Sequence, residues 1–390
     1  MHSVIMYDVA PGVPLYYRVR SYGGQWSAVR RFQPALRPGA HALTAVFTFD
    51  MASRNSGTPA DMVCETNITA VPMLVAAAEA GEFDVGFHGG DTSYNPDDNC
   101  GRTGDDFMND MAGAVDARPY VFLNGNHETS YDRTYDVSAH RFQGQLEMAY
   151  GSWSGSTRYF SKNVGPVHFV VLDGDAWTYY RVYGLAGAQY LWLEHDLASV
   201  NRTATPWLVV LSHRPMYNAW PISNEDDATR NGIRADALHE PHDVWQLELP
   251  RVPDVGRLWA VEPLLLKYGV DLWLAGHVHS YHRTWPVAGG MVARRDFVEP
   301  KAPIHILDGV GGCSGLSAAR DTPPWMAYRD PTQPNKAAYG ELQVHNATHA
   351  TWRSRHAVDR ATLDEFTIVQ HDHGPFAPPD AAMTRAERRE

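Results

Sequence analysis

Short apolar runs alternate with longer amphipathic stretches along the chain from about residue 40. Each run has the length of a buried strand and ends in polar residues; the runs cover residues 43–49, 83–88, 120–123, 167–172, 207–212 and 270–275. The stretches between them are typical of helices, most clearly at residues 71–80, 106–115, 188–199 and 256–268. Short strands with helical crossovers predict an α/β sheet, in which ligands bind at the carboxyl ends of the strands.

The two ends of the chain have a different pattern. Residues 3–34 predict about three strands, with an aromatic-rich stretch at 14–20 and a turn at Gly23-Gly24. They resemble the last strands of a fibronectin-III-like sandwich whose earlier strands precede this chain; the alternative is a short β-extension that packs on the main domain. We therefore divide the chain into a partial N-terminal β-domain (1–37), a main domain (38–372) and a disordered tail (373–390), which is rich in proline, alanine and charge.

Composition narrows the class of protein. The 390 residues include 33 Lys and Arg against 45 Asp and Glu, and the net charge of −12 argues against binding to nucleic acids or anionic membranes. No apolar run approaches the roughly 20 residues of a membrane-spanning helix. Three sequons, at Asn67, Asn201 and Asn346, favour a secreted or vacuolar/lysosomal glycoprotein whose signal peptide lies upstream. The three cysteines allow one disulfide, and a Cys64–Cys100 pair is left open.

The polar residues at the strand ends are an unusual set of metal-binding types. Seven of them offer oxygen or imidazole donors, and none is a thiolate: Asp50, Asp91, Tyr94, Asn126, His213, His277 and His279. Such donors suit borderline to hard cations. Each one alone could be a cap or a turn former. Seven are too many for one ion that must also bind a substrate, and they suit two ions bridged by a carboxylate.

Five motifs around these residues resemble those of a known family. They are Asp50-Met-Ala, Gly90-Asp-Thr-Ser-Tyr94, Gly125-Asn-His-Glu128, Leu211-Ser-His-Arg-Pro215 and Gly276-His-Val-His279. Over about residues 38–370 the chain resembles the purple acid phosphatases of the calcineurin-like metallophosphoesterase superfamily. The resemblance implies a four-layer αββα sandwich, a fibronectin-III-like N-terminal domain, and hydrolysis of phosphate monoesters by attack of a metal-bound hydroxide.

One position distinguishes subfamilies. Most metallophosphoesterases have a histidine two residues after the first aspartate, where this chain has Ala52, and Tyr94 offers a replacement oxygen. A phenol with a pKa near 10 becomes a good ligand only for a strongly acidic ion such as ferric iron. The resemblance implies Fe³⁺ held by Asp50, Asp91, Tyr94 and His279. It also implies a second ion, Zn²⁺, Mn²⁺ or Fe²⁺, held by Asp91, Asn126, His213 and His277.

The source of the leaving-group proton is open. The resemblance places His127 in contact with the phosphate or the leaving group rather than with a metal. Plant members of the family carry a histidine pair where this chain has Ile222 and Ser223. The proton would then come from His127, from His282, which could also contact substrate, or from water.

Two other functions are kept as alternatives. A phosphodiesterase or nucleotide pyrophosphatase would use the same fold and metals. A non-catalytic binding protein would be expected to have lost a ligand position, whereas all seven are intact. The partners expected are small phosphate esters; the sequence does not decide between a monomer and a homodimer.

Overall fold

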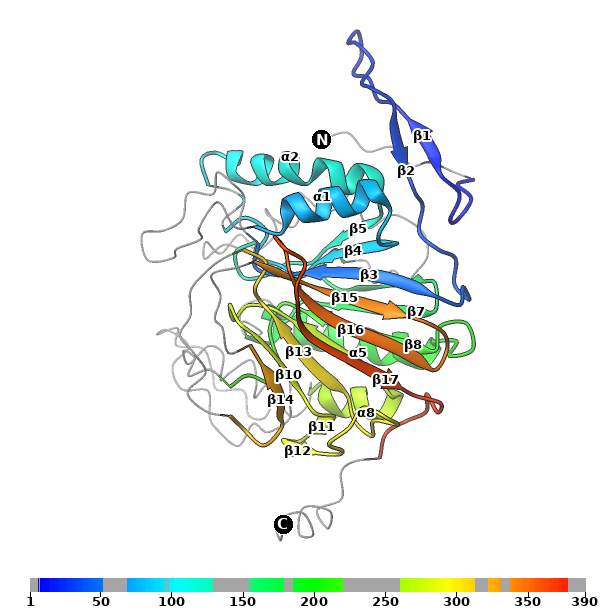
Figure 1. The fold of residues 1–390 in the computed structure, drawn as a ribbon, viewed down its shortest axis with the longest axis vertical. Helices are drawn as coiled ribbons and strands as arrows, with labels where there is room; N and C mark the ends of the chain where they lie inside the picture. Colours follow the sequence, from blue (N-terminus) through cyan, green and yellow to red (C-terminus); the bar gives the residue numbers. More distant parts are fainter. Residues whose placement is uncertain are drawn as a thin grey trace.

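Two β-sheets lie face to face in the computed structural model (Figure 1). The structure describes residues 6, 8–51, 69–94, 96, 98–128, 154, 156–178, 185–219, 260–312, 322–330 and 337–377. The first sheet has the strand order β17 (Thr362–Val369), β16 (His349–His356), β15 (Ala338–Val344), β3 (Leu43–Thr48), β4 (Val85–His88) and β5 (Tyr120–Phe122). Strands β3, β4 and β5 are parallel neighbours, whereas β15, β16 and β17 run antiparallel.

The second sheet has seven strands. Their order is β14 (Met326–Arg329), β10 (Tyr281–Thr284), β13 (Ile304–Asp308), β9 (Leu272–Ala275), β8 (Trp207–Ser212), β7 (Val167–Leu172) and β6 (Phe160–Val164). Strands β7, β8, β9 and β13 form its parallel centre. Every residue of β7, β8 and β9 is buried, which explains why these strands are continuous apolar runs rather than alternating ones. A separate pair, β11 (Val287–Ala288) and β12 (Met291–Val292), forms a small ribbon.

Aromatic rings join the two sheets through the central core. Phe47 and Phe87 of the first sheet stack with centroids 5.3 Å apart, and Phe87 meets Phe169 of the second sheet at 4.5 Å. Trp352 completes the group, 5.6 Å from Phe47. All four side chains are buried, so the contact between the sheets rests on apolar area.

Helices cover the outer faces and complete four layers. Helices α1 (Val71–Ala80) and α2 (Arg102–Ala117) lie on the first sheet, and α5 (Leu185–Ser199) and α8 (Glu262–Tyr268) on the second, beside the short α3 (Asp175–Thr178). Helix α2 buries Phe107, Met111 and Ala114, which share one face at helical spacing. The six expected strands and four expected helices are all present, with bounds that differ by a few residues, and residues 256–259 of the last helix lie outside the described part. The expected αββα sandwich is confirmed.

The N-terminal hairpin contacts helix α2. Strands β1 (Leu15–Tyr17) and β2 (Arg30–Phe32) pair antiparallel, and their outer end projects from the body (Figure 1). The Tyr17 hydroxyl donates to Asp116 Oδ1 at 3.0 Å, and Arg30 lies 3.2 Å from Asp116 Oδ2. Two of the three expected strands are thus present among the described residues, and the fibronectin-III-like assignment stays a prediction.

The first residues of the expected C-terminal tail pack on the main domain. The ring of His373 meets Trp207 edge-on at 4.9 Å, and the backbone N–H of Phe376, which is buried, donates to the Leu266 carbonyl at 2.8 Å. The ordered chain therefore extends past 372, and residues 378–390 lie outside the described part.

Two further expectations concern the surface and the membrane. Cys100 is exposed, and its candidate partner Cys64 lies outside the described residues. No helix within the described ranges is both long and apolar enough to cross a membrane.

Candidate metal centre

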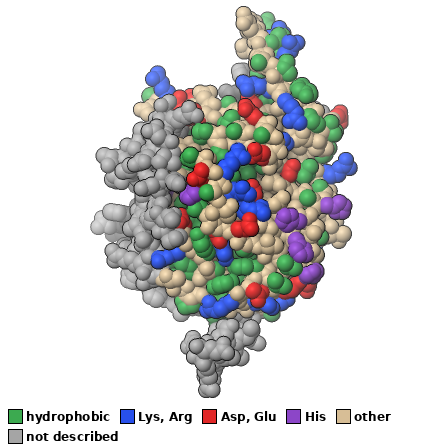
Figure 2. Space-filling model, in the orientation of Figure 1, with side chains coloured by type: hydrophobic (Ala, Val, Ile, Leu, Met, Phe, Trp, Pro, Cys, Tyr) green, Lys and Arg blue, Asp and Glu red, His purple; other side chains and the backbone are tan. Residues whose placement is uncertain are grey.

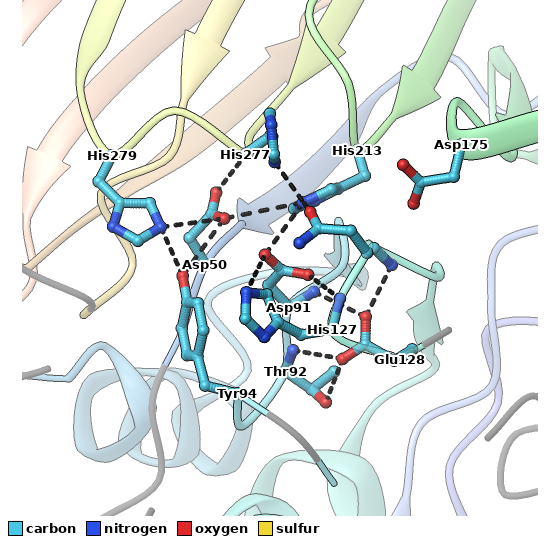
Figure 3. A network of polar contacts seen from close by, with 12 residues as sticks. Asp50, Asp91, Thr92, Tyr94, His127, Glu128, Asp175, His213, His277 and His279 are labelled. Atoms are coloured by element: carbon cyan, nitrogen blue, oxygen red, sulfur yellow. Dashed lines mark hydrogen bonds and ion pairs between the residues drawn. The ribbon is translucent and has the colours of Figure 1, made fainter. Parts of the chain in front are cut away.

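The seven candidate ligands meet where parallel strands end (Figure 3). Asp50 follows β3, Asp91 and Tyr94 follow β4, Asn126 follows β5, His213 follows β8, and His277 and His279 follow β9. The first sheet therefore supplies all the oxygen donors and the second sheet all the imidazoles. Because parallel strands present their carboxyl ends at one edge, residues far apart in sequence come together there.

One group of contacts contains the tyrosine. Tyr94 Oη lies 2.7 Å from His279 Nε2 and 3.4 Å from Asp50 Oδ1. His279 Nε2 lies 3.5 Å from the same carboxylate oxygen. Tyr94 and Asp50 are fully buried. These three side chains therefore converge at one point of the sheet edge.

A second group adjoins the first where His213 and His277 approach Asp50. Asn126 Oδ1 lies 2.9 Å from His277 Nδ1 and 3.1 Å from His213 Nε2. His213 Nε2 lies 3.1 Å from Asp91 Oδ2 and 4.0 Å from Asp50 Oδ1. The ligand atoms of Asp91, His213 and His277 all lie within 4.8 Å of one another, which is close enough for one ion to contact all three.

The backbone at this edge is strained. Asp50, Asp91, Tyr94 and His277 all adopt left-handed conformations, with φ of 55°, 55°, 51° and 72°. This region costs L-residues roughly 1–2 kcal/mol each, and a bulky side chain such as tyrosine rarely occupies it. Backbone strain of this kind clusters at functional sites.

Glycines allow the loops to approach closely. A Cβ at Gly125 would lie 2.3 Å from Asp91 Oδ1, and one at Gly90 would lie 2.7 Å from His213 Nδ1. Any side chain at these two positions would displace a candidate ligand, which explains the glycines in two of the five motifs.

Glu128 fixes the loop that carries Asp91. Its Oε2 accepts from the backbone N–H groups of Asp91 (2.8 Å) and Gly125 (2.7 Å). Its Oε1 accepts from the Thr92 N–H (2.7 Å) and hydroxyl (2.8 Å). Sequence reasoning included Glu128 in a motif without giving it a role, because its partners are mainly backbone groups that a sequence pattern does not identify.

Buried negative charge dominates the electrostatics. Burial and the charge of Asp50 raise the pKa of Tyr94 well above 10. Burial alone would lower the pKa of His213, but the Asp91 carboxylate outweighs it and raises that pKa to about 10. The cluster therefore attracts positive charge, and its donors, oxygens and imidazoles without thiolates, fit a ferric ion beside a borderline divalent ion.

His127 lies beside the cluster. Its backbone N–H donates to Asp91 Oδ1 at 3.0 Å, and its ring meets Tyr94 edge-on at 4.8 Å. Ring Nε2 is 4.0 Å from Asp91 Oδ2, so the imidazole lies beside this candidate ligand. The side chain is 11% exposed, which leaves it some access to solvent.

His282 lies on β10, where its surroundings weigh against the role expected for it. Its ring is buried on β10, where Nε2 is 3.3 Å from the Tyr217 carbonyl oxygen and the ring centroid is 5.9 Å from that of Trp325. Burial lowers the pKa of His282 to about 4. A buried, neutral imidazole turned toward a backbone carbonyl is not placed to donate a proton or to bind substrate. Ala52, Ile222 and Ser223 lie outside the described residues.

Comparisons with known proteins agree with this arrangement. Residues 60–281 match the calcineurin-like phosphoesterase family, and residues 302–365 match the C-terminal domain described as iron/zinc purple acid phosphatase-like protein C. The chain is 32% identical to human acid phosphatase type 7 over 90% of its own length and 72% of the relative's. It is also 33% identical to purple acid phosphatase 18 of Arabidopsis thaliana, over 60% of its own length and 45% of the relative's.

A solved structure supports the fold. A purple acid phosphatase from yellow lupin (Lupinus luteus) seeds superposes with a TM-score of 0.68 at 21% identity. The match covers 93% of this chain and 61% of the lupin chain. Together with the matches along the sequence, this likeness shows that the chain belongs to the purple acid phosphatases of the calcineurin-like phosphoesterase family.

Proposed function

We propose that this protein is a binuclear-metal acid phosphatase that hydrolyses phosphate monoesters. The observation that carries the proposal is that all seven candidate ligands are present and lie in two adjoining groups, which meet where His213 and His277 approach Asp50. A binding protein derived from the same fold would have no need to keep the full set.

The two groups divide the ligands between two ions. We assign Fe³⁺ to Asp50, Asp91, Tyr94 and His279, and a divalent Zn²⁺, Mn²⁺ or Fe²⁺ to Asp91, Asn126, His213 and His277. Two such ions would neutralise a phosphate ester and lower the pKa of bound water to about 7. The protein supplies the bridging carboxylate and the buried surroundings, which strengthen each electrostatic contact.

His127 is the residue we assign to the leaving group or the phosphate. It adjoins Asp91 and Tyr94 without completing either ligand set. A general acid in this position contributes typically 10²–10⁴-fold in rate. With His282 buried away from the cluster, His127 is the one described side chain among the expected proton donors that still lies beside it.

We also propose that the protein is a glycoprotein of the secretory pathway. Asn201 and Asn346 are exposed, as attached sugars require, whereas Asn67 lies outside the described residues. Expression from the full-length gene in its own cells should give protein in a vacuole or outside the cell, with a mass that falls on treatment with a glycosidase. Unglycosylated protein in the cytosol would contradict this proposal.

Metal analysis and turnover on matched substrates test the function. The purified protein should contain one iron and one divalent ion per chain, show a tyrosinate-to-iron band, and hydrolyse nitrophenyl phosphate at acidic pH. Faster turnover on bis(nitrophenyl) phosphate than on the monoester would instead support a phosphodiesterase. Two bound ions without turnover on either substrate would support the binding protein.

A further inference from the structure

Two histidine rings meet at the surface of the first sheet, outside the metal centre. His349 begins β16, and His371 follows the end of β17 by two residues. Their imidazole rings lie edge-on with centroids 6.2 Å apart. Hydrogen-bonded backbone carries both: His349 pairs with Val369, and the Gln370 N–H donates to the Thr348 carbonyl at 2.9 Å. Figure 2 shows a group of histidine side chains on the surface, on the side where β17 ends in Figure 1.

This pair is remote from the metal centre. Strand β15 runs antiparallel to β3 with Val344 opposite Leu43, so the turn from β15 into β16 lies at the amino end of β3. The candidate ligand Asp50 follows the carboxyl end of the same strand. At about 3.3 Å per residue, the six residues of β3 separate its two ends by about 20 Å. The histidine pair is therefore not part of the site already described.

The contacts of His349 leave its Nε2 atom without a proton. Ring Nδ1 lies 2.8 Å from the hydroxyl oxygen of Thr348. That hydroxyl donates its single proton to Asn346 Oδ1 at 2.9 Å, an oxygen that also accepts from the backbone N–H groups of Thr348 and His349. The hydroxyl must then accept from the ring, which places the ring proton on Nδ1 and the lone pair on Nε2. A sugar on Asn346 would attach to the amide nitrogen and leave these contacts in place.

The contacts of His371 give the same result. Ring Nδ1 lies 2.6 Å from Glu299 Oε1, and that oxygen also accepts from the backbone N–H of His371 at 2.8 Å. Because a carboxylate only accepts, Nδ1 carries the ring proton, and the neutral ring offers the lone pair of Nε2. A carboxylate behind the outer nitrogen is the arrangement that orients metal-binding histidines and makes them stronger ligands.

Both Nε2 atoms are available to a ligand. Within the described ranges no hydrogen bond or ion pair involves either atom, and the side chain of His371 is 63% exposed. A zinc–nitrogen bond is about 2.0–2.1 Å long, so two imidazoles that share one ion have ring centres up to about 6.4 Å apart. The observed separation of 6.2 Å lies within that reach.

We propose that His349 and His371 form a peripheral metal site, which binds one borderline divalent ion such as Zn²⁺ through their Nε2 atoms. Imidazole is a ligand that suits such ions. Two protein ligands are fewer than the four of a structural zinc site, so water completes the coordination and the ion exchanges readily. The ion would join the start of β16 to the segment after β17, which continues into the residues that pack on Trp207 and Leu266. The inference is independent of the proposed reaction.

Calorimetric titration of Zn²⁺ into the purified protein at neutral pH tests the proposal without measuring activity. The wild type should bind one more zinc ion per chain than His349→Gln or His371→Gln. Loss of a partner behind a ligand usually costs about 10–100-fold in affinity, so loss of a ligand should raise the dissociation constant of this ion by about 100-fold or more. Glu299→Gln should raise it by about 10-fold, because the contact behind His371 loses its charge. Iron content and turnover should stay unchanged in all three variants.

A histidine on another element provides the matched control. His195 is exposed on α5, outside the pair, so His195→Gln should bind zinc as the wild type does. Cu²⁺ gives a second readout that reports the ligands directly. Its electron paramagnetic resonance signal should show two imidazole nitrogens in the wild type and one in either His349→Gln or His371→Gln.

The outcomes separate the peripheral site from the proposed function. Equal zinc binding by the wild type and both histidine variants would overturn the peripheral site. An equal loss in His195→Gln would overturn it too, because the binding would then belong to scattered surface histidines. Neither result bears on the reaction. A metal centre that stays empty in the wild type would overturn the proposed function alone, since the difference of one zinc ion between the wild type and either variant does not depend on it.

Discussion

Replacement of Glu128 by glutamine should destabilise the protein far more than its nearly unchanged size suggests. Four donors point at the two carboxylate oxygens. Each oxygen accepts from two of these donors. The glutamine amide has only one oxygen, so its NH₂ group must face one of the two pairs of donors. The less costly orientation faces Thr92, whose hydroxyl can turn to accept, so one backbone N–H is left without a partner. Burial and the charge of Asp91 raise the pKa of Glu128, while its hydrogen bonds oppose that rise.

The size of the effect follows from these contacts. A buried N–H without a partner costs about 1–3 kcal/mol, and each of the two bonds that remain loses about 1 kcal/mol of charge assistance. We therefore expect Glu128→Gln to lower the free energy of unfolding by about 3–5 kcal/mol. The loss should occur in metal-free protein, because the contacts involve no ion.

Urea unfolding of chelator-treated protein, followed by tryptophan fluorescence, measures this difference. Glu194→Gln is the matched control, since Glu194 contacts Lys267 on the surface at 2.7 Å and such pairs contribute about 0–1 kcal/mol. A loss below about 1 kcal/mol for Glu128→Gln, similar to that of the control, would show that the loop holds its shape without the carboxylate.

Three further changes test separate parts of the site. Tyr94→Phe should remove the purple colour and keep the fold; an unchanged visible band would exclude Tyr94 as the ligand. His127→Ala should reduce turnover by about 10²–10⁴-fold on alkyl phosphates and much less on nitrophenyl phosphate, with metal content unchanged, whereas equal losses on both would leave phosphate binding as its role. The pKa of His282 falls to about 4 on folding, so between about pH 6.5 and 4 the unfolded chain binds a proton that the folded protein does not. Lowering the pH through this window should therefore reduce the free energy of unfolding, by about 3 kcal/mol in total. His282→Gln should flatten this part of the stability profile, and a profile identical to wild type would refute the burial argument.

Strand ends made most of the site predictable. Asp50 and His213 follow an apolar run directly, Asp91 follows one after two glycines, and parallel strands bring their ends to one edge whatever the loops between them do. The convergence of the candidate ligands was therefore accessible from residue types and order, without distances.

The residues that support the ligands were not predictable in this way. Glu128 acts through backbone N–H groups, and such partners depend on how loops fold in space. The burial of His282 was not predictable for a related reason. Strand β10 has a polar-looking sequence, yet it lies inside its sheet between β13 and β14 with every residue buried, so polarity did not indicate exposure.

The division of donors between the sheets also bears on how the centre is assembled during synthesis. All four oxygen donors lie within residues 50–126, and the three imidazoles lie within residues 213–279. At about 5–20 residues per second, a ribosome takes several seconds to make the segment between them. Of the seven candidate ligands, a nascent chain in that interval carries only the four oxygen donors, and oxygen donors favour hard cations such as Mg²⁺ and Ca²⁺. On the proposed assignment, the divalent ion can meet its full set of ligands only after the second half of the chain is made, and the first sheet itself is completed only by β15, β16 and β17.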